Sequence, residues 1–411
     1  MENVTLVSFR ELCPEMVGTR FSTHRLYSYP AQLIPQIPYY FLKEIPKTNG
    51  NSTVLDPFCG TGTVLVEAMH SGRASLGVEV NPVTALVAKV KTTPMAVPKL
   101  EENLRQITNL YKSIKKIEYQ KPSFENLEFW FTEKTINKLQ RIKYCIDTLK
   151  SEDNDTYDFF KACFASIIKD VSRADPRIYV PVLPRKGLRK RKKDAWTLFR
   201  FRAECNIKSM RKFLILAKSK VKNSQVICED FMKVKRDWEG IDLIITSPPY
   251  ISAQKYVRST RLEAYWLGFT KEKQLDTSKR TIGSERITKS DYQKIRHVGI
   301  NDLDSLVDEI HALDPVRAGI VNKYFHDMRK AIQKMYNVLN SGGKCVIVIG
   351  NNTAKGREVK TSEFIKSLSK ETGFCVEKIM VDKILSRGLM TKRNRTAGLI
   401  ENEWIITLRK D

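Results

Sequence analysis

The amino-acid sequence predicts an α/β fold, a doubly wound sheet interrupted by a mainly helical insertion. In the first hundred residues, short apolar segments that resemble strands alternate with helical patterns, as in parallel sheets whose strands are joined by helices. From residue 99 to about residue 222, helical spacing dominates and glycine is almost absent. Strand-like segments then return and continue to the end of the chain.

The first part of the sheet is predicted within residues 1–98. Residues 52–55 form a short apolar strand candidate, residues 63–70 a helix that ends before Gly72, and residues 74–80 a second strand candidate. A strand, a loop, a helix and a second strand in this order are the repeating unit of a parallel doubly wound sheet.

The insertion is predicted over residues 99–222, where apolar residues recur at intervals of three and four, the spacing of one helix face. The sheet is expected to resume in residues 223–411. Its strand candidates there are residues 225–228, 241–246, 344–350 and 403–408, with a helix over residues 324–339.

Composition narrows the class of protein. Of the 411 residues, 42% are hydrophobic and 28% are charged, which is enough to bury a core and excludes wholesale disorder. Lys and Arg number 71 against 46 Asp and Glu, and the net charge of +25 predicts a polyanionic partner. A basic surface without a partner is the alternative.

Cysteine usage and the chain's apolar stretches predict a reduced, cytoplasmic protein. The eight cysteines are scattered without a CxxC pair, and the five histidines form no metal-ligand pattern, so we expect no metal site. No stretch approaches the roughly 20 apolar residues of a membrane span. The N-terminus lacks a basic segment followed by an apolar one, the pattern of a secretion signal.

A glycine loop, residues 56–63 (DPFCGTGT), follows the first strand candidate. Gly60 and Gly62 permit positive φ angles and let a ligand approach the backbone, and the helix behind them offers free N–H groups. Glu79 ends the next strand, where a carboxylate suits the two hydroxyls of a ribose. A plain turn is the alternative for the loop.

Two better-known nucleotide loops do not fit this segment. The phosphate-binding pattern GxxxxGK[ST] is absent from it. The dinucleotide fingerprint GxGxxG also fails, because Leu65 stands where its third glycine belongs.

A proline pair, Ser247-Pro248-Pro249-Tyr250, closes a later strand candidate. The two prolines hold the backbone extended, so the Ser247 hydroxyl and the Pro248 carbonyl are two fixed acceptors for the hydrogens of an exocyclic amine. Such a grip aims the nitrogen lone pair at an incoming methyl group without a strong base. Tyr250 adds a flat face for a base that has left the duplex. A proline turn ending a core strand is the alternative.

Together the two segments resemble motifs of the S-adenosylmethionine-dependent DNA amino-methyltransferases. Residues 56–63 resemble their DPFxGSGT loop, and residues 247–250 their (S/D/N)PP(Y/F/W) motif. The resemblance covers residues 22–96 and 225–270 well and residues 324–408 more loosely. It implies a seven-stranded, Rossmann-like methyltransferase sheet, with a cofactor-binding half before the insertion and a catalytic half after it.

The resemblance also implies which residues bind S-adenosyl-L-methionine. Asp56 and the loop would take the amino acid end, Glu79 the ribose, and Asp230 the adenine amine, although an acidic turn is equally plausible for Asp230. Residues 24–35 resemble the family's cover over the methionine end. The complete expected set is Tyr29, Pro30, Asp56, Phe58, Gly60, Gly62, Thr63, Glu79, Asp230 and Phe231.

The implied activity is site-specific methylation of an exocyclic amine in double-stranded DNA, with Ser247, Pro248, Pro249 and Tyr250 as catalytic residues. Serine in the first position is associated with cytosine N4 and aspartate more often with adenine N6, so we favour cytosine N4. Adenine N6 methylation is the main alternative. Guanine N2 methylation in tRNA and a non-catalytic DNA-binding protein with this fold are the others.

A basic run, residues 185–193, is predicted to neutralise DNA phosphates, and a solvated loop is the alternative. A second cluster precedes the last strand candidate. The insertion is a possible target-recognition region, although it precedes Asp230 rather than following it. The expected DNA-binding residues are Arg185, Lys186, Arg189, Lys190, Arg191, Lys192, Lys193, Arg393 and Arg395.

The resemblance extends to bacterial and phage methylases, which suggests a place in a restriction-modification system. The sequence contains no nuclease motif of its own. A cognate restriction endonuclease, if there is one, is therefore expected to be a separate protein.

Overall fold

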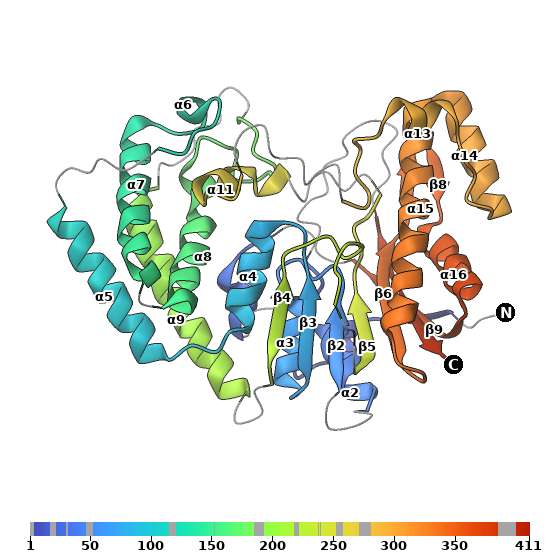
Figure 1. Cartoon of the computed structure of the whole chain (residues 1–411), viewed down its shortest axis with the longest axis horizontal. Helices are drawn as coiled ribbons and strands as arrows, with labels where there is room; N and C mark the ends of the chain where they lie inside the picture. Colours follow the sequence, from blue (N-terminus) through green and yellow to red (C-terminus); the bar gives the residue numbers. More distant parts are fainter. Residues whose placement is uncertain are drawn as a thin grey trace.

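A computed structural model gives the fold of the chain (Figure 1). The residues that it describes are 4–16, 22–29, 32–46, 52–114, 121–151, 153–184, 193–217, 222–236, 238, 240–251, 258–270, 281–384 and 400–411.

A single large sheet organises the described residues, with its eight strands in the order β1-β9-β10-β6-β5-β2-β3-β4. The strands from β4 to β6 in this order are parallel, and β10 runs antiparallel to both of its neighbours, β6 and β9. The bounds are β1 Val4–Val7, β2 Thr53–Asp56, β3 Ala74–Val78, β4 Ser224–Ile227, β5 Ile241–Thr246, β6 Lys344–Gly350, β9 Phe374–Lys383 and β10 Asn402–Lys410.

The predicted doubly wound sheet is confirmed, and it carries one strand more than the seven expected. The extra strand is β1, which pairs in parallel with β9 at the edge of the sheet. Leu6 in this strand is 82% exposed, so β1 lacks the alternation of buried and exposed residues that would mark it in the sequence.

Helices cover both faces of the sheet because most neighbouring residues on its central strands β2, β5 and β6 are buried and point to opposite sides. On one face, Leu243 and Ile245 pack against α1 (Phe9–Leu12), α2 (Gln36–Glu44) and α3 (Thr63–His70). On the other face, Ile244 belongs to a cluster with α14 (Asn301–Leu313), α15 (Pro315–Val338) and α16 (Thr361–Thr372).

The helices between the two halves of the sheet share one hydrophobic cluster with α4 (Pro82–Thr92) and with α11 (Arg261–Trp266), which follows the proline pair. They therefore pack directly on the sheet's own helices. The domain boundaries after residues 98 and 222 stay predictions. The remaining bounds are η1 Ser22–Leu26, α5 Val97–Ser113, α6 Leu127–Trp130, α7 Glu133–Asp147, η2 Thr148–Ser151, α8 Asn154–Val171, α9 Ala195–Ala217, α13 Lys289–Gln293, β7 Asn352–Ala354 and β8 Arg357–Val359.

Two groups of helices flank the edge of the sheet at which the parallel strands end. Figure 1 shows α6, α7, α8 and α11 on one side of this carboxyl edge, and α13, α14 and the start of α15 on the other. Helix α15 begins nine residues before the predicted Tyr324. Among the described helices, none combines the length and the apolar character needed to cross a membrane.

Candidate functional site

The residues predicted to form the site lie where successive strands of the chain change from one side of the sheet to the other. Strands β2, β3 and β4 follow one another outward on one side, and β5 and β6 on the other, so β2 and β5 are neighbours at the switch point. Ligands of open α/β sheets bind outside the carboxyl ends of such strands. Asp56 ends β2, and Ser247 directly follows β5.

A buried hydrogen bond joins these two strand ends. The Thr246 hydroxyl donates to Asp56 Oδ1 over 2.7 Å, and the backbone N–H of Phe58 donates to the same oxygen over 3.1 Å. Asp56 is only 3% exposed. Burial raises the pKa of Asp56 to about 7, the two hydrogen bonds oppose that rise, and the nearby charge of Glu79 adds to it.

The two loop glycines have different surroundings. Both have positive φ angles, +52° at Gly60 and +80° at Gly62. A Cβ atom on Gly60 would meet nothing within 4 Å, whereas one on Gly62 would lie 3.1 Å from the Cα of Ala88 in α4. Gly60 therefore faces open space, and Gly62 allows α3 and α4 to pack closely.

Glu79 is held by the backbone of both neighbouring loops. Its Oε2 accepts from the Gly60 N–H over 2.9 Å, and its Oε1 accepts from the Asn81 N–H over 2.8 Å. Burial raises the pKa of Glu79, and these hydrogen bonds oppose the rise. The Thr84 hydroxyl and the Val80 N–H also hydrogen-bond this carboxylate, which is therefore held in one orientation at the end of β3.

Asn81 links this loop to the segment after the proline pair. Its side-chain oxygen caps α4 by accepting from the Val83 N–H, and its amide donates to the Thr260 hydroxyl over 2.9 Å. Thr260 directly precedes α11. Neither residue is predicted from the sequence, because nothing local in the sequence pairs positions 81 and 260.

The N-terminal segment reaches the glycine loop through Gln32. Its side-chain amide donates to the Thr61 hydroxyl over 2.7 Å. Deeper in the molecule, His24 and Glu67 form a buried contact of 2.5 Å that ties η1 to α3. Tyr29 packs against the cluster formed by the helical insertion, and Pro30 lies outside the described residues.

Phe58 and Phe231, predicted from separate motifs, come together. Their rings meet edge to face with centroids 6.0 Å apart, and Phe231 also meets Trp238 at 5.7 Å. Phe231 is 2% exposed. Asp230 Oδ1 accepts from the Met232 N–H over 3.0 Å, as in a local turn. The turn alternative for Asp230 thus describes its present contacts, and its role toward adenine stays a prediction.

Tyr250 is fixed by a residue that the sequence analysis did not single out. Its hydroxyl forms a side-chain hydrogen bond with Glu403 of β10. Gly350, which pairs with Glu403 on the neighbouring strand, leaves room for the ring, since a Cβ there would lie 3.2 Å from Tyr250 Cε2. Burial, followed by the charge of Asp382, raises the pKa of Glu403 to about 7.

Most of the predicted DNA-binding residues cannot be placed. Arg185, Lys186, Arg189, Lys190, Arg191, Lys192, Arg393 and Arg395 lie outside the described residues. Lys193 is described, and its ammonium group lies 3.3 Å from Asp170 Oδ2 in α8.

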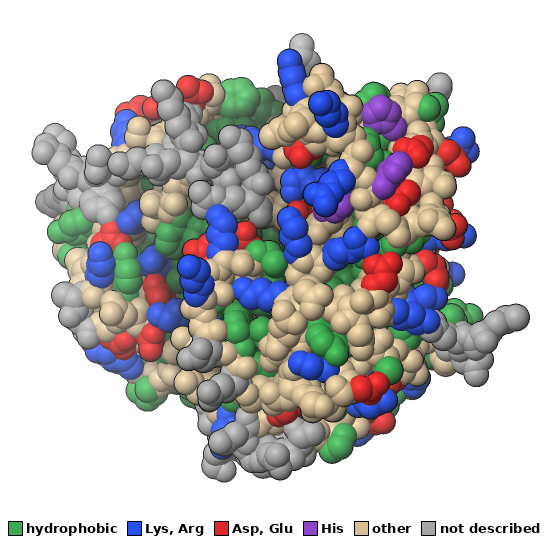
Figure 2. All heavy atoms as spheres, turned by 45° about the vertical axis from the view of Figure 1, so that its right-hand side comes forward, with side chains coloured by type: hydrophobic (Ala, Val, Ile, Leu, Met, Phe, Trp, Pro, Cys, Tyr) green, Lys and Arg blue, Asp and Glu red, His purple; other side chains and the backbone are tan. Residues whose placement is uncertain are grey.

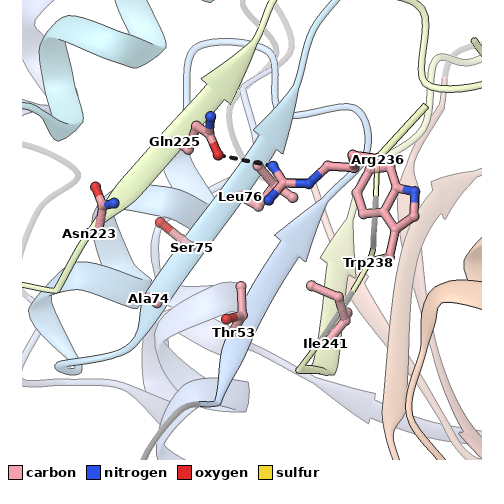
Figure 3. Close-up of a pocket in the computed structure, with 9 residues that line it drawn as sticks. All are labelled: Thr53, Ala74, Ser75, Leu76, Asn223, Gln225, Arg236, Trp238 and Ile241. Carbon is pink, nitrogen blue, oxygen red and sulfur yellow. Dashed lines mark hydrogen bonds between the residues drawn. The ribbon is translucent and has the colours of Figure 1, made fainter. Parts of the chain in front are cut away.

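A small pocket lies at the opposite edge of the sheet. Its lining includes the first residues of β2, β3 and β5, which are Thr53, Ala74 and Ile241 (Figure 3). Arg236 donates a hydrogen bond to Gln225 across the pocket. Its position at the amino ends of the strands separates it from the predicted site. The described ranges also contain no group of His, Cys, Asp and Glu that could hold a metal ion.

Comparisons with known proteins point to one family. Residues 21–89 match a family model described as DNA methylase. The Type II methyltransferase M.MvaI of Kocuria varians is 28% identical over 392 residues, which cover 86% of this chain and 82% of that protein. M.BsoBI of Geobacillus stearothermophilus, also a Type II methyltransferase, is 25% identical over 64% of this chain and 56% of its own length.

A third relative matches a shorter stretch. The Type II methyltransferase M.MjaII of Methanocaldococcus jannaschii is 36% identical over 93 residues, which are 23% of this chain and 17% of that protein. Together these matches confirm the predicted resemblance to the DNA amino-methyltransferases.

The buried carboxyl group of Asp56 predicts a pH-dependent stability. Its pKa is raised from 3.8 to about 7 in the folded chain, so the contribution of Asp56 to stability falls as pH rises between these values. The expected slope is about 1.4 kcal/mol per pH unit. Asp56→Asn keeps an acceptor for Thr246 and should remove this component from the free energy of unfolding, measured by urea denaturation at a series of pH values.

A second variant isolates the hydrogen bond. Thr246→Val removes a hydrogen-bond donor that lowers the pKa of Asp56. The pKa of Asp56 should therefore be higher in this variant, and its free energy of unfolding should keep falling up to a higher pH than in the wild type. If the free energy of unfolding changed with pH in the same way in the wild type and in Asp56→Asn, the pKa of Asp56 would not be raised by folding.

Proposed function

We propose that this DNA amino-methyltransferase transfers the methyl group of S-adenosyl-L-methionine to N4 of a flipped cytosine in double-stranded DNA. The observation that carries the proposal is the Thr246–Asp56 hydrogen bond, which places the glycine loop and the proline pair side by side. A cofactor bound at the first segment would therefore lie next to a base bound at the second. The serine at position 247 favours cytosine over adenine.

The residues of the glycine loop suit the proposed cofactor, which supplies an electrophilic methyl group. Open space in front of Gly60 leaves room for a ligand against the backbone. The Glu79 carboxylate, oriented by two backbone N–H groups, is the acceptor proposed for the ribose hydroxyls. Asp56 lies beside them, where a carboxylate can attract the positive amino group of the methionine end.

The proline pair is proposed to hold the target amine. Ser247 is partly exposed, so its hydroxyl can be reached from the site, and Pro248 is buried. The Ser247 hydroxyl and the Pro248 carbonyl would accept the two amine hydrogens and orient the nitrogen lone pair. The nitrogen loses a proton after transfer, when the methylated amine is acidic enough to need no strong base.

Tyr250 is proposed to stack on the flipped base. Half-buried and held by Glu403, it presents a ring whose orientation is fixed before the base arrives. A preorganised ring loses little conformational freedom on binding, which favours the complex. Stacking is independent of base identity, so this residue supports methylation of cytosine and adenine alike.

The modified base tests the proposed function directly. Unmethylated genomic DNA is incubated with the protein and S-adenosyl-L-methionine, digested to nucleosides and analysed by mass spectrometry. We expect N4-methylcytosine, together with its sequence context from single-molecule sequencing, and much less product from Ser247→Ala. N6-methyladenine as the product would overturn the choice of base, and methylation of tRNA alone would overturn the choice of DNA.

The two loop glycines should respond differently to substitution. Gly60→Ala puts a methyl group into the proposed cofactor space, so we expect at least tenfold weaker binding of S-adenosyl-L-methionine in calorimetry. Its positive φ should cost about 1–2 kcal/mol of stability. Gly62→Ala serves as the comparison and should lose more stability, because its Cβ would also press on Ala88. Unchanged cofactor affinity in a folded Gly60→Ala protein would contradict the assignment.

The proposed stacking role predicts a graded series at Tyr250. Tyr250→Ala should weaken binding of DNA with an extrahelical base by about tenfold to a hundredfold, which corresponds to about 1–3 kcal/mol. Tyr250→Trp and Tyr250→Phe keep a flat face and should retain more methylation activity. Glu403→Gln is the control, because it keeps an acceptor for the tyrosine. Equal activity of the Ala and Trp variants would exclude stacking.

A further inference from the structure

Four exposed cations gather on the segment that leads into α14, far in sequence from the predicted basic run. They are Arg286, Lys289, Lys294 and Arg296, named here the basic face. Within the part of the chain that the structure describes, none of the four forms an ion pair. Figure 2 shows Lys and Arg side chains close to histidines in the upper part of the face that it presents.

Three acidic residues near the basic face are engaged in contacts of their own. Glu285 pairs with Arg317 over 3.0 Å, and Asp291 accepts from the Thr288 N–H over 2.7 Å in a helix cap. Asp304 accepts from the Val298 and Gly299 N–H groups, each over 2.8 Å. These acids fold the segment, and they leave its cations available to an outside anion.

Helix α15 clamps the backbone of this segment from behind. The carbonyl oxygen of Arg296 accepts from Asn322 Nδ2 over 2.9 Å and lies 2.7 Å from His326 Nε2, and Arg329 donates to the carbonyl of Val298. Gly319 lets the segment lie close, since a Cβ there would be 2.7 Å from the Tyr292 side chain. The cations therefore project from a fixed backbone, which reduces the entropy lost on binding.

The apolar side of the segment joins the hydrophobic core that also includes the end of the proline pair. Ile287, Ile295 and Val298 belong to the same hydrophobic cluster as Tyr250 and Ile251, at the end of that pair. In Figure 1 this region, around α13 and the start of α14, rises beyond the carboxyl edge of the sheet, opposite the helices of the insertion. The basic face is thus attached through α15 to the core on which the proposed target-base residues also pack.

We propose that the basic face binds the phosphate backbone of the DNA duplex beside the flipped base. The inference rests on the proposed function, because a polyanionic substrate explains why cations on a fixed backbone gather at this edge. Lys and Arg on phosphates position the duplex without reading its sequence. The proposal adds a structured DNA contact on the side of the site opposite the insertion.

The test compares two variants that lose the same charge. The first replaces the four cations by glutamine, and the control does the same to four exposed lysines on other surfaces. Duplex binding is measured over a range of salt concentrations, and calorimetry with S-adenosyl-L-methionine together with urea denaturation checks that both proteins are folded. The test variant carries R286Q, K289Q, K294Q and R296Q, and the control K208Q, K212Q, K235Q and K378Q.

We expect the test variant to bind duplex DNA at least tenfold more weakly at low salt than the control. Its plot of log affinity against log salt should flatten by about 0.9 for every phosphate that the variant no longer neutralises. The methylated base and its sequence context should not change. The pairwise variants R286Q/K289Q and K294Q/R296Q should show intermediate effects, and they keep the test valid if the fourfold variant is unstable.

The contrary results separate the two proposals. If the wild type methylates DNA and the test variant behaves like the control, the basic face does not bind DNA and the proposed function stands. A changed recognition sequence in the test variant would overturn phosphate binding in favour of base reading. A wild type that binds the cofactor but neither binds nor methylates DNA would overturn both proposals.

Discussion

The hydrogen bond between Thr246 and Asp56 is the contact on which the site depends, because it joins two strand ends that are 190 residues apart in the chain. Both side chains are almost completely buried, and a buried carboxyl without a partner would cost several kcal/mol. Pairing of Leu55 with Ile244 sets the two ends side by side. The sheet thereby fixes the distance between the glycine loop and the proline pair more firmly than either loop could.

Two further contacts attach the segments around the proline pair to different parts of the sheet. Asn81 bonds Thr260 from the loop after β3, and Glu403 bonds Tyr250 from β10. The first contact comes from the β3 side of the switch point and the second from the β10 side. The proline pair and the residues after it are therefore positioned by the fold as a whole, which is what transfer between two ligands requires when catalysis relies on alignment.

Residues in short motifs can be predicted from the sequence, whereas their long-range partners cannot. Asp56, Glu79 and Ser247 each stand at a strand end, where local patterns of apolar residues, glycine and proline mark them. Thr260 acts through Asn81, which is 179 positions away in the chain, and Glu403 acts through Tyr250 on a distant segment. No local pattern points to partners at such separations.

The same reasoning applies to the fold. The central parallel strands are predictable because most of their residues are buried on both faces and they appear as apolar runs. Strand β9 escapes prediction because charged residues interrupt it, and β1 because it is short and exposed. Glu403 does leave a trace in the sequence, as an acid at the head of an otherwise apolar final strand. Such an acid on a buried strand requires a partner, and here the partner is Tyr250.

Net charge indicates a polyanionic partner but not the surface that meets it. Many of the described cations, such as Lys89, Lys138 and Lys193, lie in ion pairs on the protein's own surface. Exposed pairs of this kind stabilise the fold by about 1 kcal/mol at most, yet they cancel the local field. An anion is attracted where cations remain unpaired on a fixed backbone, so the distribution of acidic partners, rather than the sum of charges, decides which surface can hold DNA.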